Sequence, residues 1–168
     1  MKPLPDLASA ESDLLARLRA CVGAIQQIVT ADVTNIPAGV ALLRLVRSEA
    51  YEDINQLQHE ALLLEAAVRL RTLHPELSAM TWFWNPANTG TGEEPDLRVM
   101  RGEEIIVSVE ATASERSIGS ISVHLRKTLS KLQAMPGRRF YFVRTQDMLK
   151  AAEKQIRKFN HAITPSPL

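Results

Sequence analysis

The sequence predicts an α/β fold in which helices flank a mixed β-sheet and a further helical segment lies at the N-terminus. Apolar residues recur at helical spacing up to residue 73 and in short strand-like runs after residue 80. Toward the C-terminus, helical and strand-like patterns alternate. Three antiparallel strands followed by a helical crossover to a fourth give a sheet with both antiparallel and parallel neighbours. A chain of 168 residues, 45% hydrophobic, has the size of one domain with its own core.

Three helices are predicted in the first half of the chain. Residues 9–29 show apolar positions at helical spacing, and Pro37 fits the first turn of a second helix, where its missing N–H is harmless. The third helix covers residues 53–73 and is apolar over much of its circumference, so we expect it to be central. Residues 1–50 are therefore expected to form a helical extension that packs on the core or builds a dimer interface.

The second half predicts the sheet, within a core domain of residues 51–160. The predicted strands cover residues 80–84, 96–100, 104–112 and 139–144. Amphipathic helices are expected at residues 119–135 and 146–159. The last segment, residues 161–168, contains Pro165 and Pro167 and is predicted to be a disordered tail.

Several classes of protein are disfavoured by composition. No run of about 18 apolar residues is present, which is the length that a membrane-spanning helix needs. The first residues lack the basic start and apolar run of a secretory signal. Cys21 is the one cysteine, which excludes an internal disulfide and a multi-cysteine zinc site. We therefore expect a cytoplasmic protein without a membrane partner.

Charge is distributed unevenly along the chain. Residues 1–115 contain 9 Lys and Arg against 17 Asp and Glu, a net charge of −8, whereas residues 116–168 contain 11 against 2, a net charge of +9. Either the two halves neutralise each other in the fold, or a basic surface is available for a polyanion such as DNA. The candidate phosphate-contacting residues are Arg126, Arg138, Arg139, Arg144, Lys150, Lys154, Arg157 and Lys158.

Two carboxylates stand where adjacent strands begin and end. Asp96 opens one predicted strand, and Glu110 ends the next after a run of Ile and Val, where burial without a partner would be costly. If the strands pair across the turn at residues 101–103, the two carboxylates converge. Mg²⁺ (or Mn²⁺) accepts one or two carboxylates together with water and phosphate oxygens. Asp96 and Glu110 are therefore candidate metal ligands.

The order of elements and these residues together resemble the PD-(D/E)XK nuclease superfamily, which has the restriction-endonuclease-like fold. Pro95-Asp96 resembles the first half of its motif, and Glu110-Ala111-Thr112 resembles the second. The resemblance covers roughly residues 52–145 and implies a four-stranded mixed sheet, a Mg²⁺ ion held by the two acids, and phosphodiester hydrolysis. It also implies a supporting carboxylate on the preceding helix, Glu65, with Glu60 as the second choice.

One position departs from the motif. Thr112 occupies the place of the lysine that positions or activates the attacking water in the family, and a hydroxyl has no positive charge. Either another cation reaches the site or the site binds without cutting. On a helical wheel of residues 119–135, Arg126 and His124 border the apolar stripe and are the better candidates, whereas Lys127 points away.

Two functional hypotheses follow from the resemblance and its departure. The first is a Mg²⁺-dependent nuclease, or a nuclease-derived DNA-binding protein, with a site of Glu65, Asp96, Glu110 and Thr112. The second is a catalytically inactive protein that keeps the fold and serves as an interaction or accessory factor. A third hypothesis, a basic DNA-binding module without a metal, rests on the charge distribution alone.

Overall fold

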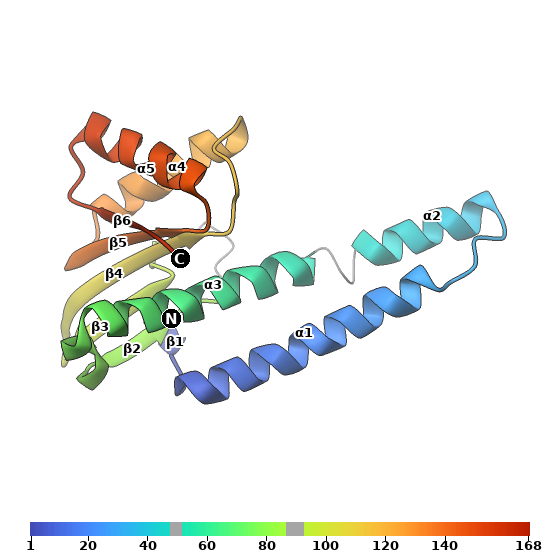
Figure 1. Cartoon of the computed structure of the whole chain (residues 1–168), viewed down its shortest axis with the longest axis horizontal. Coiled ribbons are helices and arrows are strands. Elements are labelled where there is room, and N and C mark those ends of the chain that lie inside the picture. The colour runs from blue at the N-terminus through green and yellow to red at the C-terminus, as the bar shows by residue number, and fades with distance from the viewer. Residues whose placement is uncertain (48–51, 87–92) are drawn as a thin grey trace.

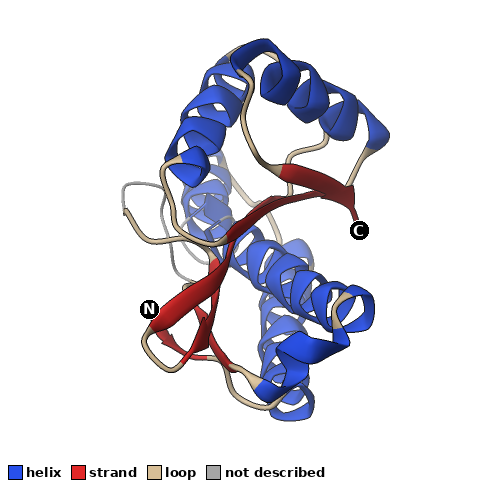
Figure 2. Ribbon diagram, turned by 90° about the vertical axis from the view of Figure 1, so that its left-hand side faces the viewer, coloured by secondary structure: helices blue, strands red, loops and turns tan. Residues whose placement is uncertain are grey.

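A six-stranded sheet separates two groups of helices in the computed structural model, which describes residues 1–47, 52–86 and 93–168 (Figures 1 and 2). The strands lie in chain order: β1 (Lys2–Pro3), β2 (Thr81–Trp84), β3 (Leu97–Arg101), β4 (Glu104–Thr112), β5 (Arg138–Val143) and β6 (Thr164–Pro167). Neighbouring strands are antiparallel from β1 to β4 and parallel from β4 to β6. The predicted α/β class and mixed sheet are confirmed, but the sheet has two strands more than the four expected.

Five α-helices are found in the described residues: α1 (Leu7–Val29), α2 (Ile36–Leu45), α3 (Glu52–Leu73), α4 (Ser120–Gln133) and α5 (Gln146–Phe159). A short 3₁₀ helix, η2 (Pro75–Ala79), connects α3 to β2. In the described part of the chain, no helix has both the length and the apolar character needed to cross a bilayer.

Each face of the sheet has its own apolar core. On one face, Val107, Val109 and Ala111 of β4 pack with α3, whose Leu62 and Leu70 are fully buried. Complete burial of one such leucine contributes about 1.5–3 kcal/mol, so α3 is central, as its sequence predicts. On the other face, the side chains of α4 and α5 cover the alternate residues of β5, with Leu125, Leu129, Met148 and Ile156 in one cluster with Tyr141 and Val143.

The C-terminal segment is ordered as an edge strand, and the prediction of a disordered tail at residues 161–168 is wrong. β6 runs parallel to β5, and the Leu168 N–H donates to the Val143 carbonyl at 3.0 Å. Along a strand, alternate N–H groups point to opposite sides, so the positions of Pro165 and Pro167 face away from β5 and their missing donors cost nothing. Proline at every second position therefore blocks further pairing at this edge.

The N-terminal helices form an arm that extends beyond the sheet (Figure 1). The first half of α1 packs on α3, with Ala10 and Leu14 buried, and Arg17 forms a bidentate ion pair with Glu60 of α3. Asn35 caps the N-terminus of α2 by accepting from the Ala38 N–H, yet α2 has no buried residue. The arm thus has one end anchored to the core and a distal half with a large exposed surface.

The turn between α4 and β5 requires glycine for two reasons. Gly137 has a φ of +77°, in the left-handed region, and a Cβ at this position would lie 2.6 Å from the Ile106 carbonyl oxygen of β4. The absence of a side chain therefore lets this turn approach β4, where the parallel pairing of Val107 with Arg138 begins. This pairing fixes the register between β4 and β5.

Replacing Gly137 with alanine is expected to destabilise the fold more than replacing Gly102, which serves as a matched control. Gly102 also has a positive φ, +59°, but a Cβ there meets nothing within 4 Å. Gly102→Ala should cost only the left-handed conformation, about 1–2 kcal/mol, whereas Gly137→Ala adds an overlap with the backbone of β4. Urea unfolding measures both, and equal losses would contradict this account of the turn.

Candidate functional site

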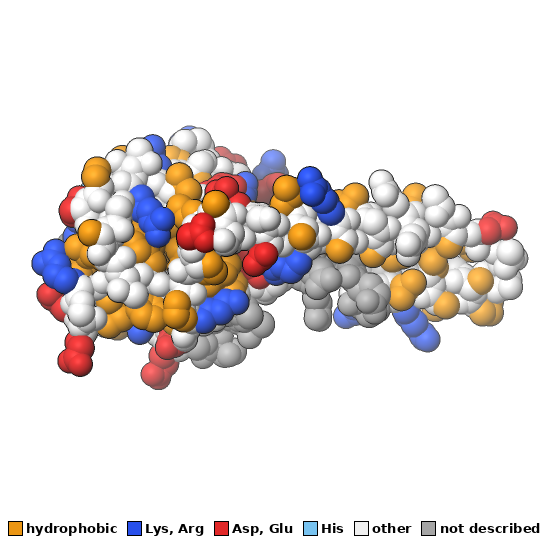
Figure 3. Space-filling view, turned by 90° about the horizontal axis from the view of Figure 1, so that it is seen from below, with side chains coloured by type: hydrophobic (Ala, Val, Ile, Leu, Met, Phe, Trp, Pro, Cys, Tyr) orange, Lys and Arg blue, Asp and Glu red, His pale blue; other side chains and the backbone are white. Residues whose placement is uncertain are grey.

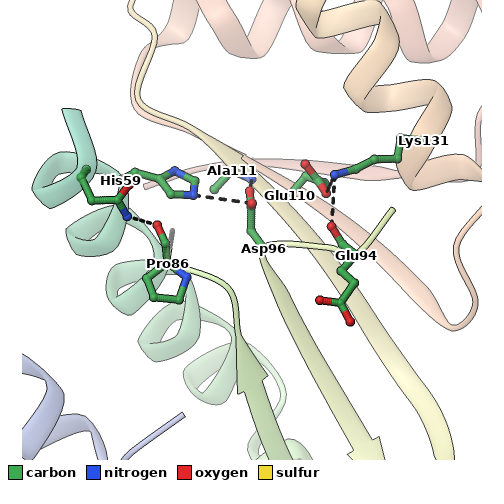
Figure 4. A network of polar contacts seen from close by, with 8 residues as sticks. His59, Pro86, Glu94, Asp96, Glu110, Ala111 and Lys131 are labelled. Carbon is green, nitrogen blue, oxygen red and sulfur yellow. Dashed lines mark hydrogen bonds and ion pairs between the residues drawn. The ribbon is translucent and has the colours of Figure 1, made fainter. Parts of the chain in front are cut away.

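Asp96 and Glu110 lie side by side at the point where β3 begins and β4 nears its end (Figure 4). The Asp96 N–H donates to the Val109 carbonyl at 3.0 Å, and the next residue, Leu97, pairs with Val109 in the antiparallel ladder. Asp96 is 4% exposed and Glu110 is 5% exposed. The ladder therefore brings together, out of water, the two carboxylates that the sequence predicted to converge.

Asp96 is held by contacts from two elements. One carboxylate oxygen, Oδ2, accepts from the Ala111 N–H at 2.8 Å, and the other, Oδ1, lies 3.5 Å from Nε2 of His59 on α3. A backbone N–H directed at a carboxylate stabilises its charge where water is excluded. Asp96 thus lies between His59 on one side and Glu110 on the other (Figure 4).

Lys131 supplies the positive charge at the site. Its Nζ lies 2.6 Å from Oε1 of Glu110 and donates to the Glu94 carbonyl at 3.2 Å. It comes from the last turn of α4, on the opposite side of the carboxylate pair from His59 (Figure 4). The side chain of Lys131 is 25% exposed, and its ammonium group reaches the buried carboxylate.

Burial, together with the neighbouring charge of Asp96, raises the pKa of Glu110 to about 8, while Lys131 acts in the opposite direction. Two ionised carboxylates in a poorly hydrated place repel each other, and one lysine does not fully compensate. A cation of higher charge between them would lower the cost of ionising Glu110.

Tyr141 and Thr112 complete the same side of the sheet. Glu110 pairs with Tyr141 across the parallel β4–β5 ladder, and Tyr141 is 1% exposed. Burial raises the pKa of Tyr141, with a further contribution from the charge of Glu110, whereas a hydrogen bond with Thr112 lowers it. Thr112, the residue at the motif-lysine position, therefore contributes a hydroxyl to a polar cluster and no charge.

The expected supporting carboxylate lies elsewhere. Glu65 is 48% exposed and pairs with Arg144 at 3.0 Å, and Glu60, the second choice, is paired with Arg17. Glu65 follows His59 by six positions, which is a rotation of about 240° around a helix. The residue of α3 that contacts the carboxylate pair is therefore His59 in place of Glu65.

The predicted cation substitutes are also different from the one observed. Arg126 and His124, the two predicted candidates, are exposed on α4, and so is Lys127, which was expected to point away from the site. Lys131 lies seven positions after His124, almost two complete helical turns, so both residues share one side of the helix. Lys127, four positions before Lys131, lies on that side as well, whereas Arg126, five positions before it, is rotated by about 140°. The helical wheel was therefore right about the side of His124, and it was wrong to prefer Arg126 to Lys127.

The eight basic residues proposed to contact phosphates fall into two groups. Three make contacts within the protein: Arg138 with His74 and Glu76, Arg139 with the Met135 carbonyl, and Arg144 with Glu65. The other five, Arg126 on α4 and Lys150, Lys154, Arg157 and Lys158 of α5, are exposed, and so are Arg138 and Arg144 despite their ion pairs. Helix α5 is thus the main basic surface that remains accessible.

The donor set suits a hard divalent cation better than zinc or another metal that needs a closed cage. Within residues 1–47, 52–86 and 93–168, no group of three or more His, Cys, Asp and Glu side chains is arranged to hold a metal ion. Mg²⁺ does not need such a group, because it keeps several waters and takes one or two carboxylates from the protein. Asp96 and Glu110 provide that number.

Comparison with protein-family models, with curated protein sequences and with solved structures gives no match for this chain.

The pKa of Glu110 predicts a pH dependence of stability. Between its ordinary value of 4.5 and about 8, the folded state holds a proton on Glu110 that the unfolded chain has released. The free energy of unfolding should therefore fall as pH rises through this window, by more than about 1.4 kcal/mol, the equivalent of one pKa unit. Urea midpoints measured across the window test this. Glu110→Gln, which cannot ionise, should remove the decrease, and an unchanged slope in this variant would contradict the assignment.

Proposed function

We propose that this chain is a Mg²⁺-dependent phosphodiesterase of the PD-(D/E)XK type that acts on DNA, with Lys131 in the role of the motif lysine. The observation that supports this most is the convergence of three side chains: two buried carboxylates from adjacent strands, and a lysine from the following helix, 2.6 Å from one of them. The sequence provides the two acids in motif order, and the fold provides the missing charge from another element.

The position of Lys131 matches what the motif requires. Thr112 shares a strand face with Glu110, since residues two apart point to the same side, and a lysine at Thr112 would project toward that face. Lys131 reaches Glu110 on that face from α4. The same charge is thus delivered to the same carboxylate from a different place in the chain.

Asp96 and Glu110 are the residues that would hold the metal. Bound there, Mg²⁺ or Mn²⁺ would lower the pKa of a coordinated water and stabilise the negative charge that develops on a phosphoryl group. The raised pKa of Glu110 supports this assignment, because the repulsion between the two carboxylates is the cost that a divalent cation relieves.

The remaining residues of the site would bind the substrate phosphate and orient the metal-binding carboxylates. The ammonium group of Lys131 places positive charge next to the position of the scissile phosphate, where it stabilises the transition state more than the ground state. The Ala111 N–H holds Asp96 in one orientation, and His59 lies against its other oxygen. These contacts fix the carboxylate before any substrate arrives, which reduces the reorganisation that the reaction requires.

DNA is the proposed substrate because the exposed basic surface lies on the same side of the sheet as Lys131. Helix α5 packs with α4 in one apolar cluster, and its four exposed Lys and Arg residues point away from that cluster. Contacts of this kind hold a phosphate backbone without reading its sequence. A duplex bound along α5 would bring its backbone to the layer that contains Lys131.

An inactive accessory protein is the second candidate, and one observation favours it. Glu110 and Lys131 form an ion pair with the carboxylate 6% exposed, which is what a closed structural pair looks like. In that case Lys131 neutralises Glu110 permanently, and the threonine at position 112 means that the catalytic lysine of the motif has been lost. The two candidates differ in whether divalent ions and Lys131 matter for cleavage.

Cleavage of plasmid and single-stranded DNA with Mg²⁺ or Mn²⁺ should depend on Lys131 and on the acids. Lys131→Ala should reduce the rate by about 100-fold or more, the usual loss when a transition-state charge partner is removed. Asp96→Asn and Glu110→Gln should do the same. Thr112→Lys introduced into Lys131→Ala should recover at least part of the activity, because it returns the charge to the same strand face.

Lys127→Ala is the matched control, since Lys127 is an exposed lysine of the same helix, and it should leave the rate unchanged. Equal trace activity in the wild-type chain and all variants would point to a contaminating nuclease and to the accessory role. Failure of Thr112→Lys to restore any activity, in a variant that folds, would contradict the assignment of Lys131 to the lysine role.

Binding to DNA should depend on α5 and on salt. Replacing Lys150 and Lys154 with glutamine should reduce the slope of log affinity against log salt concentration by about 2, one for each phosphate that is no longer neutralised. Fluorescence anisotropy with a labelled duplex in Ca²⁺ or EDTA measures this. The control variant replaces Lys2 and Arg19, two exposed basic residues of the N-terminal segment, and should change nothing. Identical slopes in both variants would exclude α5 as the binding surface, and affinity indifferent to Ca²⁺ and EDTA would favour a metal-free DNA-binding module.

A further inference from the structure

The distal arm, residues 20–45, has an apolar surface that the other described parts of the chain leave exposed. From Ala20 to Leu43, Asp32 is the only charged residue, and there is no aromatic residue. Hydrophobic side chains recur along the arm where it extends from the domain (Figure 3). A helix that is apolar and poor in charge is normally buried, so this surface requires an explanation.

Helix α1 has two apolar stripes, displaced from each other by one residue. The inner stripe, which includes Leu14, Cys21 and Ile28, faces α3 and the groove toward α2. The outer stripe consists of Leu15, Leu18, Val22, Ile25 and Val29. Its spacing alternates between three and four residues, which is the heptad pattern of a helix that packs against another helix. The inner stripe has that partner in this chain, whereas the outer stripe faces solvent.

Helix α2 repeats the arrangement. Leu42 and Leu45 line a groove of about 340 Å³ together with Ala24 and Ile28 of α1. An outer stripe of Ile36, Val40 and Leu43 is 83%, 42% and 70% exposed. On both helices, the outer stripe is rotated in the same direction from the inner one. Because α2 runs back along α1 (Figure 1), helical geometry puts both outer stripes on one side of the hairpin.

The two outer stripes form a face of the size that one partner contributes to a stable dimer. Seven of their eight side chains are between 37% and 83% exposed. The exposed fractions of these side chains, multiplied by the surface area of an aliphatic side chain, give on the order of 400 Å² of exposed apolar surface. A standard interface buries about 800 Å² per partner, roughly 65% of it apolar in homodimers. The side chains of the outer stripes therefore account for most of the apolar area that one partner contributes to such an interface.

We propose that a second copy of this chain covers this face, with the two arms packed against each other as a four-helix bundle. A two-fold dimer requires a surface that is complementary to itself, and an apolar, heptad-spaced face without charges meets that requirement. A lipid surface fits less well, because interfacial helices combine many Lys and Arg on a polar face with aromatic anchors. Residues 15–45 contain no aromatic residue and three arginines, of which Arg17 is paired with Glu60. The inference does not depend on the proposed nuclease activity.

Sedimentation velocity of the full chain tests the proposal. The wild-type protein should sediment as a species with twice the 18.7 kDa mass of one chain. The double variant Val22→Glu/Leu43→Glu, with one charge on each outer stripe, should weaken the dimer at least ten-fold and keep the same circular dichroism spectrum. Because Val22 and Leu43 are 52% and 70% exposed, these changes leave the core of one copy intact.

The matched control is Val123→Glu/Ile118→Glu, which changes two aliphatic residues of similar exposure, 43% and 67%, outside the arm. This variant should remain dimeric. A wild-type chain that is a folded monomer at high micromolar concentration would overturn the proposal. So would a control that dissociates as readily as the arm variant, or a monomer that binds vesicles of anionic lipid through Val22 and Leu43.

Discussion

The repulsion between two buried carboxylates, Asp96 and Glu110, is the constraint around which the second half of the molecule is arranged. Antiparallel pairing of β3 with β4 forces the two side chains together where water is largely excluded. Lys131, the Ala111 N–H and His59 each offset part of the cost. Because Lys131 belongs to α4, the electrostatics of the strand ends also fix one end of that helix to β4. Apolar side chains at these positions would stabilise the fold at least as well, because buried ion pairs seldom contribute more stability than well-packed apolar residues.

The opposite charges of the two sequence halves neutralise each other only in part. Part of the basic half neutralises acids of the first half, through the pairs of Lys131 with Glu110, Arg138 with Glu76 and Arg144 with Glu65. The remainder, mainly on α5, stays exposed. Neutralisation therefore occurs beside the carboxylate site and along the sheet, whereas four exposed basic residues are concentrated on α5.

Local patterns were sufficient to predict most elements and the two acids, and contacts distant in sequence explain the rest. Helical periodicity and strand alternation indicated α1 to α5 and the strands β2 to β5, and the register across a tight turn indicated the meeting of Asp96 and Glu110. The edge strands β1 and β6 were not predicted because proline normally argues against a strand. Its missing N–H is harmless only where the strand lies at the edge of the sheet with that position facing away from its neighbour. Lys131 was missed because the turn of α4 that reaches Glu110 depends on the connection at residues 113–119 and on how the helix packs across the sheet.

Anomalous diffraction from crystals soaked in Mn²⁺ would test most directly whether the carboxylate pair is a metal site. The account predicts one anomalous peak within coordination distance of both Asp96 and Glu110, together with a shift of the Lys131 ammonium group away from its present contact with Glu110. A soaked crystal in which Lys131 keeps that contact, and in which no peak lies near either carboxylate, would contradict the account and leave Glu110 and Lys131 as a structural ion pair.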